Sequence, residues 1–244
     1  MFNLFSRKKA QVLLPYRTDL HSHLLPGIDD GSPDTGTSLQ LVAQMRQWGI
    51  TRIIATPHVT EDRFENTRES IEAALQQLRS RLDGEAPEIL YSAEYRLDDN
   101  FIKHFRNDTL IPLPHNYLLI ENSFIQPFWD LKNLVFELQL KGFKPILAHP
   151  ERYAYYYENR KIYTELRQAG CLFQINWLSL AGYYGKETRN IARWMINNQL
   201  VDLAGTDLHN LHHARVITDY LNSSDYRKIS TKTALKNDTL FAAE

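Results

Sequence analysis

Two histidines and three aspartates lie within the fourteen residues "DLHSHLLPGIDDGS", which span positions 19–32. In an extended strand, residues i and i+2 point to the same side, so His21 and His23 face one side together. Asp207 and His209 have the same spacing near the other end of the chain. Imidazole and carboxylate ligands without thiolates suit zinc, manganese or iron. The two pairs therefore indicate chemistry at a metal site.

Further imidazole and carboxylate side chains follow other short apolar runs of the sequence. They are His58, Glu94, Glu121 and His149, and Asp30 lies in the turn after the first histidine pair. A lone histidine in such a place is usually an ordinary polar residue. Burying a carboxylate, in contrast, costs several kcal/mol unless it is paired, and no comparable set of lysines or arginines ends these runs. Divalent metal ions would supply the missing positive charge.

Seven short apolar runs are predicted to be the strands that position these side chains. The runs are 16–23, 52–58, 88–94, 117–121, 144–149, 171–176 and 201–207. They are nearly continuous in apolar residues rather than alternating, which is typical of parallel strands buried on both faces. Each run ends close to one or more of the candidate ligands, except that 171–176 ends in Asn176.

Helical patterns separate the apolar runs. They cover 35–48, 66–82, 128–141, 159–169 and 187–198, and the polar segment 212–240 is predicted to be helical in part. In 66–82, for example, Ile71, Leu75, Leu78 and Leu82 are spaced to line one face of a helix. Strand–helix alternation predicts an α/β fold with a parallel sheet, either closed as a barrel or open and doubly wound. In such barrels the active site lies at the carboxyl ends of the strands, where all the candidate ligands would meet.

The bulk composition predicts one ordinary globular domain over 1–244, with a loosely ordered segment at 1–15. The chain has 28 Lys and Arg against 29 Asp and Glu, which gives no support for nucleic-acid binding. A contact of the N-terminal segment with a membrane surface or a partner is the weaker alternative. No apolar run approaches the ~20 residues of a transmembrane segment. One cysteine excludes a disulfide within the chain and fits a reducing cytoplasm.

Several other reactive or aromatic residues are assigned no catalytic role. A cysteine-based tyrosine phosphatase needs Cys-x5-Arg, but a tryptophan stands six residues after Cys171, so this cysteine is predicted to be a core residue. His212 and His213 are expected to be exposed at the start of a helix. Tyr183 and Tyr184 are expected to pack on the barrel, with contact to a substrate ring as the alternative.

Taken together, the motifs resemble those of a known superfamily. "DLHSH", "TPH", "AEYR", "HPERY" and "GTDLHN" are similar to the PHP (polymerase and histidinol phosphatase) superfamily. "HSHLLPGIDDGS", "ATPH", "LAHPERY" and "INWLSLAGYYG" more narrowly resemble its bacterial protein-tyrosine phosphatase branch, which is linked to capsule and exopolysaccharide production. The likeness spans about 17–215. It implies a distorted (β/α)7 barrel that holds three divalent metal ions, with manganese expected first and iron or zinc as alternatives.

The resemblance also implies how the ligands are shared among the three ions. The first ion would be bound by His21, His23, Glu94 and Asp207. The second would be bound by Glu94, acting as a bridge, with Glu121 and His149. The third would be bound by Asp30, His58 and His209. Asp29 remains an alternative to Asp30, which is preferred because it lies seven residues after His23, as in the family.

The activity implied by the resemblance is hydrolysis of phosphotyrosine. Clustered metal ions lower the pKa of a bound water toward ~7 and so provide a hydroxide nucleophile. Arg152 is the first candidate to bind the phosphate, because a guanidinium matches phosphate with two hydrogen bonds. Arg215 and Arg96 are the second and third. The segment before Arg215 is one residue longer than in the family, so its alignment is open.

By the same resemblance, the substrate would be a phosphotyrosine protein. The tyrosine-rich tail of a bacterial tyrosine kinase that regulates polysaccharide synthesis is the expected partner. Two alternatives remain open from the residues alone. One is another PHP phosphoesterase, such as a histidinol phosphatase, with the same metals and a different pocket. The other is a metal-stabilised binding module without turnover.

Overall fold

The computed structural model of the chain describes residues 13–241. The predicted loose segment 1–15 therefore lies mostly outside the described residues. Of its last residues, Leu14 is buried, and its backbone N–H donates a hydrogen bond to the carbonyl of Trp48 at 2.9 Å. Leu14, the second described residue, is thus fixed to the fold by both burial and a backbone hydrogen bond.

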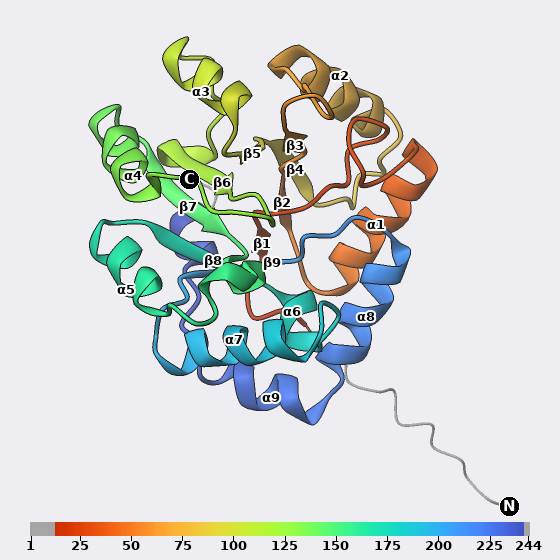
Figure 1. Cartoon of the computed structure of the whole chain (residues 1–244). Coiled ribbons are helices and arrows are strands. Elements are labelled where there is room, and N and C mark those ends of the chain that lie inside the picture. The colour runs from red at the N-terminus through yellow and green to blue at the C-terminus, as the bar shows by residue number, and fades with distance from the viewer. Residues whose placement is uncertain (1–12, 242–244) are drawn as a thin grey trace, which may run out of the picture.

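The described strands pair in parallel and gather at the middle of the molecule, with helices around them (Figure 1). They are β1 (Thr18–Asp19), β2 (Arg52–Ala55), β3 (His58–Val59), β4 (Glu88–Tyr91), β5 (Glu94–Arg96), β6 (Tyr117–Glu121), β7 (Lys144–Ala148), β8 (Leu172–Asn176) and β9 (Leu203–Gly205). One sheet has the order β1-β2-β4 and the other the order β3-β5-β6-β7-β8-β9. The predicted α/β fold with parallel strands is confirmed.

Two of the seven predicted strands are each divided between the two sheets. The run 52–58 contributes β2 and β3, and the run 88–94 contributes β4 and β5. Pro57 stands at the first break and has no N–H to donate, although its carbonyl accepts a hydrogen bond from Glu94 N at 3.0 Å. The strand pairing therefore forms two sheets instead of the one closed sheet of a barrel.

Helices occur in each predicted helical segment, with bounds that differ by a few residues, and the polar segment 212–240 contains most of three of them. They are α1 (Thr35–Gln47), α2 (Arg68–Arg79), α4 (Leu131–Leu140), α5 (Lys161–Gln168), α7 (Lys186–Asn197), α8 (Leu211–Leu221), α9 (Ser224–Ser230) and α10 (Asn237–Phe241). In α2, Ile71, Leu75 and Leu78 are buried, and Thr67 caps the first turn through the backbone N–H of Ser70. Helices α3 (Asp99–Arg106) and α6 (Trp177–Ala181) were not predicted, and both are short, with eight and five residues.

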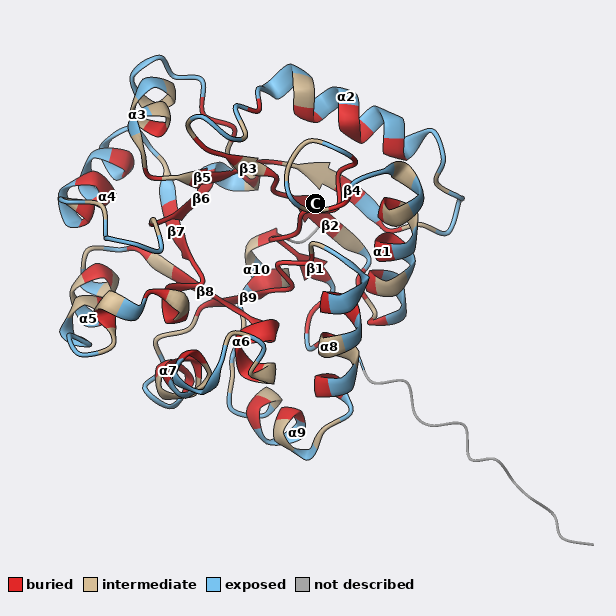
Figure 2. Cartoon of the chain, turned by 45° about the vertical axis from the view of Figure 1, so that its right-hand side comes forward, coloured by how far each residue is buried: buried red, intermediate tan, exposed pale blue. Residues whose placement is uncertain are grey.

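The helices bury their inner faces against the strands and expose their outer faces (Figure 2). A second, smaller apolar cluster lies among the strands themselves and includes Leu20, Ile54, Leu119, Ile146 and Leu203. Phe241 of α10 joins this cluster, and the helix packs against β1 near the amino ends of the strands. Apolar packing thus fills one end of the strand array, which leaves the carboxyl ends for polar side chains.

Among the residues that the structure describes, no helix is long and apolar enough to cross a membrane.

Candidate metal centre

The nine predicted ligands lie together at the carboxyl ends of the strands. Six are buried: His21, His23, Glu94, Glu121, His149 and Asp207. His58 and His209 are half-buried, with side chains 15 % and 16 % exposed, and the side chain of Asp30 is 39 % exposed. The cluster is therefore deep at one side and open to solvent at the side of Asp30.

The two histidines of the first predicted set lie close to both of its carboxylates. His21 Nε2 and His23 Nε2 are 3.2 Å apart, and each lies 3.2–3.5 Å from Glu94 Oε2 and Asp207 Oδ1. Two ligands ~2.0–2.1 Å from a tetrahedral ion are about 3.3–3.4 Å apart, so these separations suit ligands of a shared metal ion. Donor atoms within 4.8 Å of one another form the group His21, His23 and Glu94 and the group His21, His149 and Asp207.

Outer hydrogen bonds orient both histidines of this set. His21 Nδ1 lies 2.8 Å from Gln174 Oε1, and His23 Nδ1 lies 2.8 Å from Asp29 Oδ2. Since each Nδ1–H donates outward, Nε2 is the nitrogen that faces the carboxylates of the set. Without a metal these carboxylates favour a proton on Nε2, and a cation bound there would replace that proton.

Asp29 and Asp30 take different places in the structure. The carboxylate of Asp29 accepts hydrogen bonds from the His23 ring and from the backbone N–H groups of Gly31 and His58. Asp30 Oδ1 lies 3.5 Å from His58 Nε2 and 3.6 Å from His209 Nε2. This geometry supports Asp30 as the ligand of the third set. Asp29 instead accepts a hydrogen bond from the ring of the predicted ligand His23.

The second predicted set is joined to the third by His58. Glu94 Oε1 lies 3.0 Å from His149 Nε2, which is also 3.8 Å from Glu121 Oε2. His58 Nδ1 lies 3.1 Å from Glu94 Oε2 and 3.6 Å from Glu121 Oε1. Within the described residues, His58 Nδ1 and Glu94 Oε2 are buried without a hydrogen-bond partner. Unsatisfied polar atoms that face one another fit a position for a cation between them.

The pKa values of the buried groups reflect this concentration of charge. Burial disfavours a charged His21, but the carboxylates of Glu94 and Asp207 outweigh it and raise its pKa to about 9. Burial and the neighbouring charge of Glu94 raise the pKa of Glu121 to about 7. Burial lowers the pKa of His149 to about 4, so this imidazole is neutral and free to bind a metal at neutral pH.

Backbone strain accompanies two of the predicted ligands. His149 has a φ of 32° and Asp207 a φ of 49°, both in the left-handed region that non-glycine residues seldom occupy. Gly31 has a further steric role, because a Cβ at this position would lie 2.0 Å from His23 O. The turn that carries Asp29 and Asp30 therefore approaches the first strand as closely as a glycine allows.

Of the three predicted arginines, Arg152 reaches the cluster. Its Nη1 lies 3.2 Å from Asp207 Oδ2, and its guanidinium lies 4.0 Å from the ring centre of Tyr184 and 4.4 Å from that of Phe124. Arg96 belongs to β5, and its Nε is buried without a partner among the described residues.

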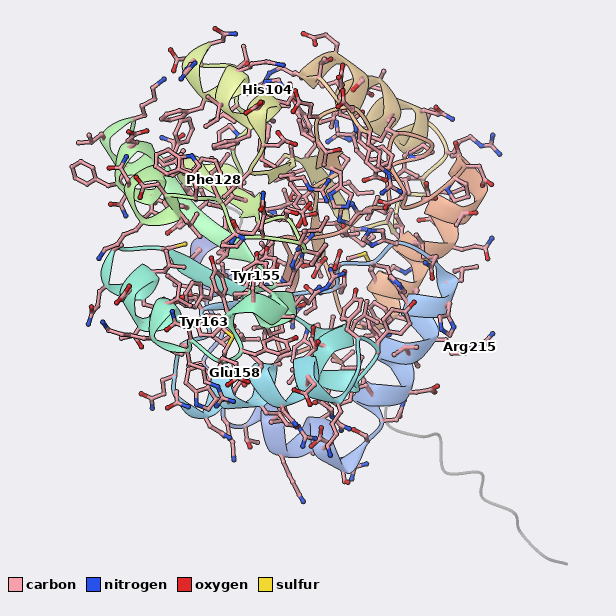
Figure 3. The ribbon with its side chains drawn as sticks, in the orientation of Figure 1. His104, Phe128, Tyr155, Glu158, Tyr163 and Arg215 are labelled. Atoms are coloured by element: carbon pink, nitrogen blue, oxygen red, sulfur yellow. The ribbon has the colours of Figure 1, made fainter. Side chains whose placement is uncertain are left out.

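The structure does not bring Arg215 to the cluster. Arg215 is exposed on α8 at the edge of the molecule (Figure 3), and no hydrogen bond or ion pair of the described residues joins it to a predicted ligand. A role for Arg215 in binding phosphate therefore stays a prediction that no contact in the described structure supports.

The structure also tests the residues to which no catalytic role was assigned. Cys171 is buried, and burial raises the pKa of its thiol to about 12, which confirms that it is a core residue. His213 is buried rather than exposed as predicted, because its Nδ1 accepts a hydrogen bond from His209 N and its ring packs against Tyr183. Tyr184 packs under Arg152 at the rim of the cluster.

Two polar residues of β8 support the cluster and were not predicted to do so. Asn176 Nδ2 donates to Asp207 Oδ2 at 2.6 Å, and Gln174 Nε2 donates to Asn176 Oδ1 at 2.8 Å. Both are completely buried. Two amide side chains at i and i+2 in an otherwise apolar strand are the signal that could have identified them.

A family model and individual related proteins place the chain in the same family. A family model described as capsular polysaccharide synthesis, CpsB/CapC, matches residues 17–232. The chain is 32% identical over 196 residues to tyrosine-protein phosphatase YwqE of Bacillus subtilis (strain 168), covering 79% of this chain and 77% of YwqE. It is 29% identical over 201 residues to tyrosine-protein phosphatase CpsB of Streptococcus pneumoniae, covering 79% of this chain and 83% of CpsB.

Solved structures agree with the sequence matches. The chain superposes with a TM-score of 0.77 and 28% identity on a crystal structure from work on YwqE and CpsB, which are described there as metal-dependent tyrosine phosphatases. The superposition covers 92% of this chain and 94% of the other chain. A histidinol phosphate phosphatase of Lactococcus lactis matches at a TM-score of 0.50 and 17% identity, which shows a shared fold alone. The chain therefore belongs to the CpsB/CapC family of capsular polysaccharide synthesis.

Proposed function

We propose that this protein is a metal-dependent tyrosine-protein phosphatase, which hydrolyses the phosphate ester of phosphotyrosine in proteins. The observation that carries the proposal is the short separation, 3.2–3.5 Å, of the Nε2 atoms of His21 and His23 from each other and from Glu94 Oε2 and Asp207 Oδ1. Membership of the CpsB/CapC family, whose relatives YwqE and CpsB are named as tyrosine-protein phosphatases, supports the choice of substrate.

We propose that the cluster holds three divalent ions, with manganese first and iron or zinc as alternatives; the imidazole and carboxylate groups that could each hold an ion support this proposal. The first would be held by His21, His23, Glu94 and Asp207, the second by Glu94, Glu121 and His149, and the third by Asp30, His58 and His209. Bound there, the ions would lower the pKa of a water that attacks phosphorus and would offset the negative charge of the phosphoryl group. His58 Nε2 lies near Asp30 and His58 Nδ1 near Glu94, so this ring stands between the second and third positions, and the neutral imidazole would bind one ion through its one lone pair.

Arg152 is proposed to bind the phosphoryl oxygens of the substrate. Asp207 fixes one end of its guanidinium, and the rings of Phe124 and Tyr184 stack on it. These contacts hold the side chain in place before substrate binds, so little side-chain entropy is lost on binding. Arg96, whose Nε is buried and free of hydrogen bonds in the described structure, is a second candidate for the same role.

We further propose that the two sheets together form a distorted seven-stranded barrel. Ser22 and Leu208 form an isolated parallel bridge, and His23 N donates to Leu208 O at 3.0 Å, which links the first and last strand segments. Hydrogen bonds also run on both sides of Pro57, from Ser92 N to Ala55 O and from Glu94 N to the Pro57 carbonyl. These bonds support a ring of strand segments whose carboxyl ends surround the metal centre.

The substrate is proposed to be the tyrosine-rich tail of a bacterial tyrosine kinase that regulates capsule or exopolysaccharide synthesis, with the cytoplasm as the compartment. The family description supports the link to capsular polysaccharide. The single buried cysteine is compatible with a reducing compartment.

A substrate panel tests the proposed activity. Purified protein loaded with Mn²⁺ is expected to release phosphate faster from a phosphotyrosine peptide than from histidinol phosphate or a phosphoserine peptide. Arg152→Ala should lower kcat/KM by about 100-fold, because a charged hydrogen bond to the transferring group is lost. Arg227→Ala, at an exposed position on α9, is the matched control and should have no such effect. Faster release from histidinol phosphate would contradict the proposal.

A further inference from the structure

A groove outside the metal centre lies between α3, the start of α4 and the loop 122–130. Its volume is about 690 Å³, and its apolar lining includes Leu97, Ile102, Phe105, Phe128 and Trp129. Phe128 lies inward of α4, while α3 forms the other side of the groove and carries His104 (Figure 3). The side chain of Trp129 is 87 % exposed, which is unusual for the largest apolar side chain.

The same loop forms a wall of the metal centre. The ring of Phe124 stacks on His149 with 5.7 Å between ring centres and lies against the guanidinium of Arg152. Asn122 holds the base of the loop, because its Oδ1 accepts a hydrogen bond from Phe128 N at 3.0 Å and its Nδ2 donates to Tyr156 OH. A peptide whose phosphotyrosine occupies the centre would therefore pass over this loop to reach the groove.

The polar lining of the groove is predominantly acidic. It includes Asp98, Asp99, Asp130 and Glu137, against Arg106 as its cation. None of these five takes part in an ion pair within the described part of the chain. Asp98 caps α3 and accepts hydrogen bonds from Glu61 N and Phe101 N, and Glu137 accepts one from Asn133 Nδ2, whereas no hydrogen bond to the side chain of Asp130 is found among the described residues. Carboxylates beside an aromatic surface complement a ligand that carries both an apolar and a cationic side chain.

We infer that the groove binds the peptide segment next to the phosphotyrosine, with an apolar or aromatic side chain on Phe128 and Trp129. A lysine or arginine of the same segment faces the carboxylates of Asp130 and Glu137. The inference rests on the proposed phosphatase function and adds a substrate preference to it. A second copy of the chain fits less well, since a two-fold axis through the groove would bring like charges together.

Two phosphotyrosine peptides that differ only in basic or acidic residues beside the phosphotyrosine test this inference. The metal-loaded enzyme is expected to cleave the basic peptide with about tenfold higher kcat/KM, the size expected of two exposed ion pairs. The double variant Asp130→Asn, Glu137→Gln should lose most of this preference. The matched control Asp219→Asn, an exposed carboxylate on α8, should retain it. Equal cleavage of the two peptides by the unaltered enzyme would overturn the inference.

Hydrolysis of p-nitrophenyl phosphate, which has no flanking residues, separates this inference from the proposed function. All variants should hydrolyse it as the unaltered enzyme does; failure of the unaltered enzyme itself would refute the phosphatase function instead. Trp129→Ala should lower kcat/KM several-fold for the basic peptide and not for p-nitrophenyl phosphate. A change of sedimentation from dimer to monomer in Trp129→Ala, with peptide kinetics unchanged, would identify a second copy as the occupant and overturn the inference.

Discussion

At the scale of single residues, the centre depends on groups that do not themselves face the donor cluster. Asp29 orients His23, Gln174 orients His21, and Asn176 holds the second oxygen of Asp207. Such outer partners fix the tautomer and direction of a ligand, so their loss weakens a metal site without removing a ligand.

Asp29→Asn tests this role. The substitution keeps the size of the side chain but replaces a carboxylate that accepts from the His23 ring with a neutral amide. Affinity for Mn²⁺ is expected to fall about 10–100-fold, the usual cost of losing an outer partner, while the fold is retained. Titration followed by elemental analysis measures the affinity, and circular dichroism checks the fold. An unchanged affinity would contradict the assignment of Asp29 as the residue that orients His23.

At the scale of the elements, the carboxyl ends of the strands and the loops after them position the ligands. The loop after β1 brings Asp30 toward His58 and His209. This path requires Gly31, because a Cβ at position 31 would lie only 2.0 Å from His23 O. A side chain at position 31 would force the loop away from the strand.

Gly31→Ala is therefore expected to lower the free energy of unfolding by at least about 2 kcal/mol, as backbone clashes of this kind do. It should also reduce metal binding at the position that includes Asp30. Gly84→Ala is the matched control, because a Cβ there would meet nothing within 4 Å. Chemical denaturation of both variants measures the difference. Equal stability of the two would refute the proposed steric role of Gly31.

Sequence reasoning predicted what depends on local periodicity. The pairs His21 with His23 and Asp207 with His209 follow from the two-residue repeat of a strand, and the helices follow from the spacing of apolar residues such as Ile71 and Leu75. The residues alone left Asp29 and Asp30 open, because that choice depends on the path of a turn, and Asp30 was preferred only through the family resemblance. The direction of Arg215 depends on where α8 begins, which residue spacing does not fix.

At the scale of the whole molecule, the buried charges of the centre couple metal binding to stability. In protein without metal, the stabilisation that comes from protonated His21 is fully present below its ordinary pKa of about 6.5. It is lost as pH rises through the raised value of about 9. The raised pKa of Glu121, about 7, acts in the same direction, because ionisation of a buried carboxylate disfavours the folded state.

The thermal midpoint of chelated protein should therefore fall between pH 6.5 and 9, a window in which the free energy of unfolding decreases by on the order of 3 kcal/mol from His21. Protein saturated with Mn²⁺ should lose much less over the same window, because the metal displaces the protons of the cluster. Differential scanning calorimetry at several pH values compares the two. A midpoint that rises with pH in the chelated protein would show that the imidazole–carboxylate contacts do not control its stability.

We propose that the clustered imidazoles and carboxylates hold the metal ions on which phosphotyrosine hydrolysis depends. Elemental analysis of the purified protein, combined with phosphate release from a phosphotyrosine peptide before chelation, after chelation and after addition of Mn²⁺, tests this dependence directly. We expect three ions per chain, loss of at least 100-fold in activity with chelation, and recovery with Mn²⁺. Full activity in protein stripped of metal would contradict it.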